Sequence, residues 1–256
     1  MIKAIFFDID GTLVPHGKTQ MPKSTLKALC ALKEKGIKLF IATGRPPASI
    51  NHVKAMFSFD GFLTANGQYC FNENTIIHEQ YIPKESIQQV IPYIEGNHIP
   101  VVFATIDNCY RNQYNNFEFD KDSLVIDLKS LMNDNIVQIM TYLSPNEDKL
   151  FLKHTPQCQS ARWTDAFADI IPEDGGKDRG IDHMIQYYNI SLDEVMAFGD
   201  GENDLTMLKH VPYSVAMGNA NDVVKSHANY TTTHIDDNGI ANALIHFGIL
   251  DKSILE

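Results

Sequence analysis

Three short segments of the sequence place carboxylates and hydroxyls directly after apolar runs. They are Asp8–Thr12 (DIDGT), Thr43–Arg45 (TGR) and Gly199–Asp204 (GDGEND). In an open parallel sheet, ligands bind beyond the carboxyl ends of the strands, so we expect the three segments to meet in one crevice. A single Asp-x-Asp or Thr-Gly is more often a loop cap or a turn. Three such segments at one sheet edge indicate a functional site.

The carboxylates of Asp8, Asp10 and Asp200 predict a site for a hard cation. Two aspartates one residue apart on an extended chain point the same way, and Asp200 adds a carboxylate from another strand. Like charges packed together are costly unless a cation neutralises them, and all-oxygen ligands select a hard ion. Mg²⁺ is the expected ion because it keeps several waters and completes its shell with phosphate oxygens. Calcium is the structural alternative, but strand-end aspartates do not resemble a calcium loop with its distant Glu.

The elements that must position these residues are short apolar runs alternating with amphipathic stretches. Four of the runs are expected to be buried strands, at residues 2–7, 39–42, 61–65 and 195–198. Residues 24–35 and 181–188 keep apolar side chains at helical spacing. This alternation predicts an α/β fold, a doubly wound parallel sheet with helices on both faces. Asn66-Gly67 is a tight-turn signal and predicts a hairpin after the third run.

The pattern changes between about residues 82 and 177. Prolines punctuate this stretch, expected strands at 100–105 and 136–143 lie between helical pieces, and a turn-rich polar patch covers 112–116. The first pattern returns after about residue 180. We therefore predict a discontinuous core formed by 1–81 and 178–256, which carries an inserted α+β cap domain at 82–177.

Taken together, these segments resemble the haloacid-dehalogenase (HAD) superfamily of phosphohydrolases, and the resemblance covers the whole core. The second acid of Asp8–Thr12 is typical of its phosphatase members. The segment Gly199–Asp204 and the size of the insert are similar to the Cof-type branch, which has a large α/β cap. The family's Lys, shortly before a helix of the returning core, is matched by Lys177. Arg179 is a rival for this position, and an ordinary surface Lys is the alternative for Lys177 taken alone.

The resemblance implies a role for each acid. Asp8 would be the nucleophile that forms an aspartyl-phosphate, and Asp10 would be the general acid and base. The carboxylates of Asp8 and Asp200 and the main-chain carbonyl of Asp10 would hold Mg²⁺. Asp204 would orient Lys177 or a metal-bound water, although a carboxylate at a helix start explains Asp204 almost as well.

The resemblance also implies the contacts to the phosphoryl group. Lys177 would stabilise the charge that develops in the transition state. The other contacts would come from Thr43, Asn203 and the backbone N–H groups of Ile9 and Gly44.

Other polar and aromatic residues are given structural roles. Arg45 and Asn66 lie near the mouth of the expected crevice, where a structural hydrogen bond is favoured over a substrate contact. Trp163 is expected to pack in the core or on the surface, and His183 is expected on the surface.

Charge and cysteine content limit the class of partner and the compartment. The chain has 21 Lys and Arg against 32 Asp and Glu, a net charge of −11, which disfavours nucleic acid and anionic lipid as partners. The four cysteines are scattered singly, so we expect them to be reduced. The N-terminal stretch lacks the features of a signal peptide, and no apolar stretch reaches the ~20 residues of a membrane helix. A cytoplasmic protein is expected.

The predicted function is Mg²⁺-dependent hydrolysis of small phosphate monoesters, and the resemblance to the Cof-type branch favours sugar phosphates. The expected partner is a small phosphorylated metabolite. Two alternatives stay open: a phosphomutase, and a protein that binds phosphorylated metabolites without catalysis. The sequence makes no prediction of the oligomeric state.

Overall fold

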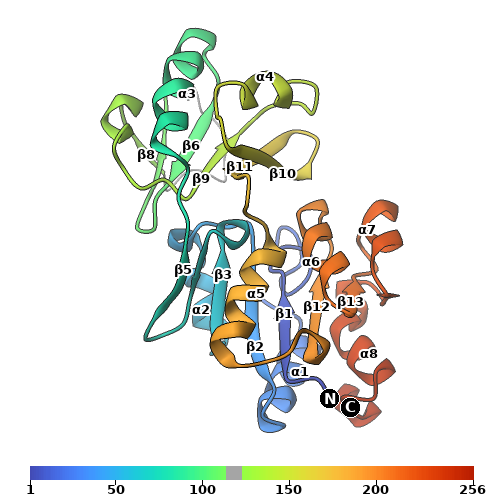
Figure 1. Ribbon diagram of the computed structural model, residues 1–256. Coiled ribbons are helices and arrows are strands. Elements are labelled where there is room, and N and C mark those ends of the chain that lie inside the picture. Colours follow the sequence, from blue (N-terminus) through green and yellow to red (C-terminus); the bar gives the residue numbers. More distant parts are fainter. Residues whose placement is uncertain (114–122) are drawn as a thin grey trace.

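The computed structural model describes residues 1–113 and 123–256, and these form two β-sheets with helices packed on them (Figure 1). The larger sheet has eight strands: β1 (Ala4–Phe7), β2 (Lys38–Ala42), β3 (Gly61–Thr64), β4 (Tyr69–Phe71), β5 (Ile76–Glu79), β12 (Val195–Gly199), β13 (Tyr213–Ala216) and β14 (Tyr230–Thr231). Their order is β14-β13-β12-β1-β2-β3-β4-β5. Neighbours from β14 to β3 pair in parallel, whereas β4 and β5 add an antiparallel extension. This extension confirms the predicted hairpin.

Strand β1 lies in the middle of the sheet because every one of its side chains is apolar and buried. Ile5 and Phe7 pack with α1 (Lys23–Glu34) and α8 (Gly239–His246) on one face. Ala4 and Phe6 pack with α5 (Lys177–Tyr188) and α6 (Leu205–His210) on the other. Helices therefore cover both faces, as predicted, and two shorter helices, α2 (Asn51–Met56) and α7 (Asp222–His227), complete this part.

The smaller sheet has six strands in the order β10-β11-β9-β6-β7-β8. They are β6 (Val101–Ala104), β7 (Cys109–Arg111), β8 (Leu124–Val125), β9 (Gln138–Thr141), β10 (Cys158–Thr164) and β11 (Phe167–Pro172). One face packs on α3 (Lys84–Asn97) through a core that includes Ile87 and Phe103. The other face carries Val102, Met140 and Phe167 and packs with Ala65 of the larger part. A short helix, α4 (Asp148–Leu152), flanks β10.

The strands of the smaller sheet come from residues 101–172, between those of the larger sheet at 4–79 and 195–231. This order is what an insertion requires, and Figure 1 shows the smaller sheet as a separate layer beyond one end of the larger sheet. The predicted domain boundaries at 81/82 and 177/178 stay predictions.

Several elements differ at their ends from the predicted ones. The third strand stops at Thr64 because Ala65 and Asn66 adopt positive φ angles of 49° and 54°. Helix α5 starts at Lys177, earlier than the predicted start at 181. Part of the turn-rich patch at 112–116 lies outside the described residues. Among the described helices, none combines the length and the apolar character needed to cross a lipid bilayer.

Gly180 allows α5 to approach β3 closely, which leads to a stability prediction. A Cβ at this position would lie 2.5 Å from Leu63 Cδ1 and 3.0 Å from Gly67 Cα. We expect Gly180→Ala to lower the free energy of unfolding by about 1–3 kcal/mol, measured by denaturant unfolding. The matched control is Gly96→Ala in α3, where a Cβ meets nothing within 4 Å and the change should be neutral or stabilising by up to about 1 kcal/mol. Equal unfolding midpoints for Gly180→Ala and the wild type would contradict the close approach.

Candidate active site

A cavity of about 870 Å³ lies between the carboxyl ends of the parallel strands and the smaller sheet. The side of the larger sheet contributes all three segments singled out in the sequence, through residues that include Asp8, Asp10, Thr43, Gly44, Asp200 and Asn203. The smaller sheet contributes Met140, Trp163, Phe167 and Asp169 from β9, β10 and β11. The expected convergence of the three segments on one crevice is therefore present in the fold.

Lys177 is completely buried and bridges two carboxylates, of which Asp8 lines this cavity. Its Nζ donates to Oδ1 of Asp8 at 2.7 Å and to Oδ1 of Asp204 at 2.5 Å. The side chain of Lys177 has 0% exposure, and Asp8 has 6%. The surface alternative for Lys177 is therefore wrong. Arg179, the rival, lies exposed on α5.

The charges in this cluster shift one another's titration. Burial raises the pKa of Asp8 well above its usual value; Lys177 opposes this, while the carboxylates of Asp204, Asp200 and Asp10 add to it. Burial alone would lower the pKa of Lys177, but the charges of Asp204 and Asp8 outweigh it and raise that pKa. Lys177 is thus held as a cation, and it pairs with two carboxylates.

Asp200 stands beside Asp8 and is held by residues from two loops. Its Oδ1 accepts a hydrogen bond from Thr12 Oγ1 at 2.9 Å, and its Oδ2 accepts one from Asn219 Nδ2 at 3.2 Å. Gly11 makes this approach possible because its φ is +86° and a Cβ there would lie 2.1 Å from Asp200 Oδ2. Asn219 was not identified from the sequence, although it follows β13 and so carries the same strand-end signal as the others.

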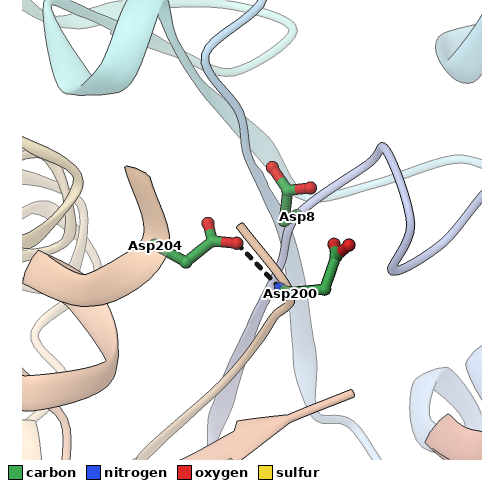
Figure 2. Close-up of side chains that lie close together, drawn as sticks. All are labelled: Asp8, Asp200 and Asp204. Atoms are coloured by element: carbon green, nitrogen blue, oxygen red, sulfur yellow. Dashed lines mark hydrogen bonds between the residues drawn. The ribbon is translucent and has the colours of Figure 1, made fainter. Parts of the chain in front are cut away.

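Asp204 organises the loop that carries Asp200. Its Oδ2 accepts the backbone N–H groups of Asp200 and Gly201, both at 2.9 Å, and its Oδ1 is taken by Lys177. Figure 2 shows the three side chains close together, with the hydrogen bond from the Asp200 amide to Asp204 dashed. Asp204 is completely buried, whereas Asp8 and Asp200 line the cavity, so Asp204 is the least available of the three as a metal ligand.

The carboxylates fit a divalent cation. Asp8, Asp200 and Asp204 each offer an oxygen, and these oxygens lie within 4.8 Å of one another. The donors are hard oxygens, which suits Mg²⁺, and a divalent ion between Asp8 and Asp200 would offset the repulsion that raises the pKa of Asp8.

Asp10 is clamped by Arg45, and both residues line the cavity. Nε and Nη2 of Arg45 each donate to one oxygen of Asp10 at 2.7 Å, which is a bidentate pair. Burial acts to raise the pKa of Asp10, but the hydrogen bonds and charge of Arg45 outweigh it and lower that pKa. Arg45 was expected to make a structural hydrogen bond; the structure shows an ion pair with Asp10, a predicted site residue.

The remaining predicted residues are Gly44, Asn203, Thr43 and Ile9. A Cβ on Gly44 would lie 3.1 Å from Asn66 Oδ1, 3.1 Å from Asp169 Oδ2 and 3.2 Å from Asn203 Nδ2. Thr43 is buried and its Oγ1 accepts the backbone N–H of Arg45 at 3.1 Å. The side chain of Ile9 belongs to the core, so only its backbone is available to a ligand.

Comparison with known proteins identifies the family. A model of the haloacid dehalogenase-like hydrolases matches residues 5–244. The chain belongs to this family. It is 31% identical to the putative phosphatase YkrA of Bacillus subtilis (strain 168), over 97% of this chain and 98% of that protein. It is 27% identical to 5-amino-6-(5-phospho-D-ribitylamino)uracil phosphatase YitU of the same organism, over 94% and 95%.

Solved structures of the family agree with these matches. The HAD subclass IIB sugar phosphatase BT4131 superposes with a TM-score of 0.91 at 38% identity, covering 97% of this chain and 100% of that one. The phosphatase BT1666 of Bacteroides thetaiotaomicron gives 0.88 at 27% identity, over 98% and 96%. The predicted superfamily, fold class and enzyme class, a HAD-type phosphatase, are confirmed at this level.

Two residues on the cap side of this HAD-type enzyme were not predicted to line a site. Asp169 of β11 is 2% exposed, and its Oδ2 accepts a hydrogen bond from Asn66 Nδ2 at 2.8 Å. Trp163, expected to serve packing only, is 44% exposed and lines the cavity. Asn66 makes the expected structural hydrogen bonds: its Nδ2 donates to Asp169 and Gln138 on the other sheet, and its Oδ1 accepts from Asn203 Nδ2 at 3.4 Å.

The titration of Asp169 gives a pH-dependent stability. Burial raises its pKa from 3.8 to about 7, against the hydrogen bond from Asn66 and the charge of Lys177. Between these values the native state holds a proton that the unfolded state has released, so this group lowers the enzyme's stability as pH rises. Asp169→Asn removes the effect. We expect the free energy of unfolding of Asp169→Asn, minus that of the wild type, to rise by on the order of 1 kcal/mol per pH unit from pH 5 to 7 and then to level off. Urea unfolding at pH 5, 6, 7 and 8 measures this, and a constant difference would contradict the assignment.

Proposed function

We propose that this enzyme hydrolyses small phosphate monoesters, with sugar phosphates favoured, and that it uses Mg²⁺ and an aspartyl-phosphate on Asp8. One observation carries the proposal: the Asp8 carboxylate lies at the base of the cavity, paired with the buried cation Lys177 and beside Asp200. The names of BT4131, a sugar phosphatase, and of YitU, a phosphatase of a phosphorylated ribitylaminouracil, support the substrate class.

Asp8 would act as the nucleophile. Lys177 fixes one oxygen of its carboxylate, so the other oxygen is available to attack phosphorus. The attack forms an acyl-phosphate bond and breaks the ester P–O bond, which divides one difficult displacement into two easier ones. Lys177 would meanwhile offset the charge of the phosphoryl oxygens that approach it.

Mg²⁺ would be held by the carboxylates of Asp8 and Asp200 and the main-chain carbonyl of Asp10. When bound there, the ion supplies positive charge that lets an anionic nucleophile and an anionic phosphate come together. Asp204 would act on Lys177 and on the loop of Asp200, because both of its oxygens are already engaged.

Asp10 would transfer the protons. Arg45 keeps its carboxylate ionised, which is the form that activates water in the second half-reaction. In the first half-reaction Asp10 would donate a proton to the leaving oxygen. Each oxygen of Asp10 accepts a hydrogen bond from Arg45, and an oxygen that carries a proton accepts poorly. At least one of these two hydrogen bonds must therefore break before Asp10 can act as an acid.

The phosphoryl group would be bound by Thr43, Asn203 and the backbone at Ile9 and Gly44; of these residues, Thr43, Gly44 and Asn203 line the cavity. Met140 and Phe167 of the smaller sheet cover it with apolar surface. This cover would limit the access of bulk water to the intermediate. A phosphomutase would use the same residues and return the phosphate to the substrate, and no observation favours it.

Replacement of the nucleophile tests the chemistry. We expect Asp8→Asn to lower kcat for p-nitrophenyl phosphate and for sugar phosphates at least 10³-fold, since the amide is not a nucleophile. The same variant should lose the acid-stable label that the wild type acquires from a ³²P-labelled ester. Asp236→Asn, an exposed carboxylate that pairs with Lys18, is the matched control and should keep wild-type activity. Isomer formation without phosphate release would instead support the mutase, and tight binding without turnover would support the non-catalytic alternative.

Removal of the metal tests the carboxylate cluster. We expect EDTA to abolish turnover and Mg²⁺ to restore it, because the repulsion around Asp8 is otherwise uncompensated. Asp200→Asn should raise the Mg²⁺ concentration for half-maximal activity at least tenfold, measured by titration, while Asp236→Asn leaves it unchanged. Full activity in EDTA would rule out the metal site.

A further inference from the structure

The proposed mechanism makes no use of Asp169, a carboxylate buried in the roof of the cavity. It lies on β11 opposite Met140 of β9, on a sheet face that is otherwise mainly apolar. Its Oδ2 is bound by Asn66, but its Oδ1 has no hydrogen-bond partner among the described residues. A buried polar atom without a partner is costly and rare in native structures, so this oxygen calls for an explanation.

A purely structural role does not explain the charge. Gln138 lies on the same face and already joins the two sheets, since its Nε2 donates to the carbonyl of Gly44 at 3.1 Å and its Oε1 accepts from Asn66 at 3.3 Å. A neutral amide at position 169 would satisfy Asn66 equally well. The carboxylate adds only an unpartnered oxygen, and burial raises its pKa to about 7.

Trp163 is directed to the same cavity by an irregularity in its strand. The register between β10 and β11 shifts between Arg162 and Thr164, which leaves Trp163 unpaired. Such bulges re-aim side chains and are frequent near functional sites. The indole packs edge-on against Phe167 at 5.6 Å and keeps 44% of its surface exposed, so it offers an apolar platform beside Asp169.

The charged residues on the cap side of the cavity are acidic. Of the described residues that the smaller sheet and its loops contribute, only Asp107 and Asp169 are charged. The cations around the cavity lie on the other side, where Arg45 is already paired with Asp10. When Asp169 is ionised, above its pKa of about 7, a second phosphate or carboxylate on the leaving group would meet repulsion here, whereas a hydroxyl would meet an acceptor.

We propose that Oδ1 of Asp169 accepts a hydrogen bond from a hydroxyl of the leaving group while Trp163 packs against its carbon face. The cap side thereby selects an uncharged polyhydroxylated leaving group over one with a second anionic group. This inference rests on the proposed phosphatase function. It assigns the specificity of the enzyme for the leaving group to Asp169 and Trp163.

Kinetics with paired substrates test the inference. The panel contains hexose 6-phosphates, pentose 5-phosphates, sugar-alcohol phosphates, fructose 1,6-bisphosphate and p-nitrophenyl phosphate, which lacks a hydroxyl. We expect Asp169→Asn to lower the ratio of kcat/KM for the best polyol phosphate to that for p-nitrophenyl phosphate at least tenfold. In this variant Asn66 Nδ2 still donates to the side-chain oxygen of residue 169. The side-chain NH₂ group of residue 169 then takes the place of Oδ1, so a donor replaces the acceptor. Gln138→Met, the matched control, loses a contact between the sheets and should lower both values in proportion.

Two further measurements separate recognition from structure. For the wild type, kcat/KM for one monodeoxy analogue should be at least tenfold lower than for the best sugar phosphate itself. Asp169→Asn should not show this difference. Trp163 is the single tryptophan of the chain, so its fluorescence reports binding. In Asp8→Asn protein with Mg²⁺, the best sugar phosphate should change this fluorescence saturably, and adding Asp169→Asn should raise Kd at least tenfold.

The outcomes distinguish this inference from the function on which it rests. No turnover of any ester above the Asp8→Asn background would overturn both. Turnover of p-nitrophenyl phosphate with a preference for the bisphosphate, or an unchanged substrate ratio in Asp169→Asn, would overturn this inference alone. A proportional loss for all substrates would make Asp169 a structural residue and would also overturn it.

Discussion

The site depends on one buried cation, Lys177, held between two buried carboxylates. Taking three charges out of water is costly, and the arrangement is tolerable only because each charge is hydrogen-bonded. Lys177 reaches Asp8 and Asp204, and Asp204 in turn binds the backbone amides at Asp200 and Gly201. Loss of the ammonium group would leave both carboxylates unpaired. The same contacts that fix Asp8, the proposed nucleophile, therefore fix the loop that carries Asp200, a proposed metal ligand.

This cluster can form because the parallel sheet brings separate chain segments to one edge. Strands β1, β2 and β12 pair in register, so the residues that follow them emerge side by side. Close approach then requires a missing side chain at a few points. Gly11 admits the Asp200 carboxylate, and Gly180 lets α5, which begins with Lys177, pack against β3. The backbone thus sets the distances between the charged side chains of the cluster.

The sequence predicts the part of the site that local patterns determine. Asp8, Thr43 and Asp200 could be assigned because each follows an uninterrupted apolar run, and such runs become the central strands. Lys177 was assigned by resemblance alone, since no local pattern distinguishes it from a surface Lys. Asp169 and Trp163 could not be assigned. Their orientation depends on the pairing of β11 with β9 and on a shift between β10 and β11, which are long-range features. Asn219 could have been found by applying the strand-end rule to β13.

Two of the buried carboxylates, Asp204 and Asp169, contrast in a way that bears on function. Asp204 has every oxygen bound within the protein, so its burial is compensated and it supports the structure. Asp169 has one oxygen bound and one without a partner among the described residues, so the fold bears an uncompensated cost at that position. A sequence selected for stability alone would place an amide or an apolar residue there. Natural proteins retain such local conflicts where function requires them. Because Asp169 belongs to the lining of the cavity, a hydroxyl of a ligand bound there can complete the hydrogen bonding of its Oδ1.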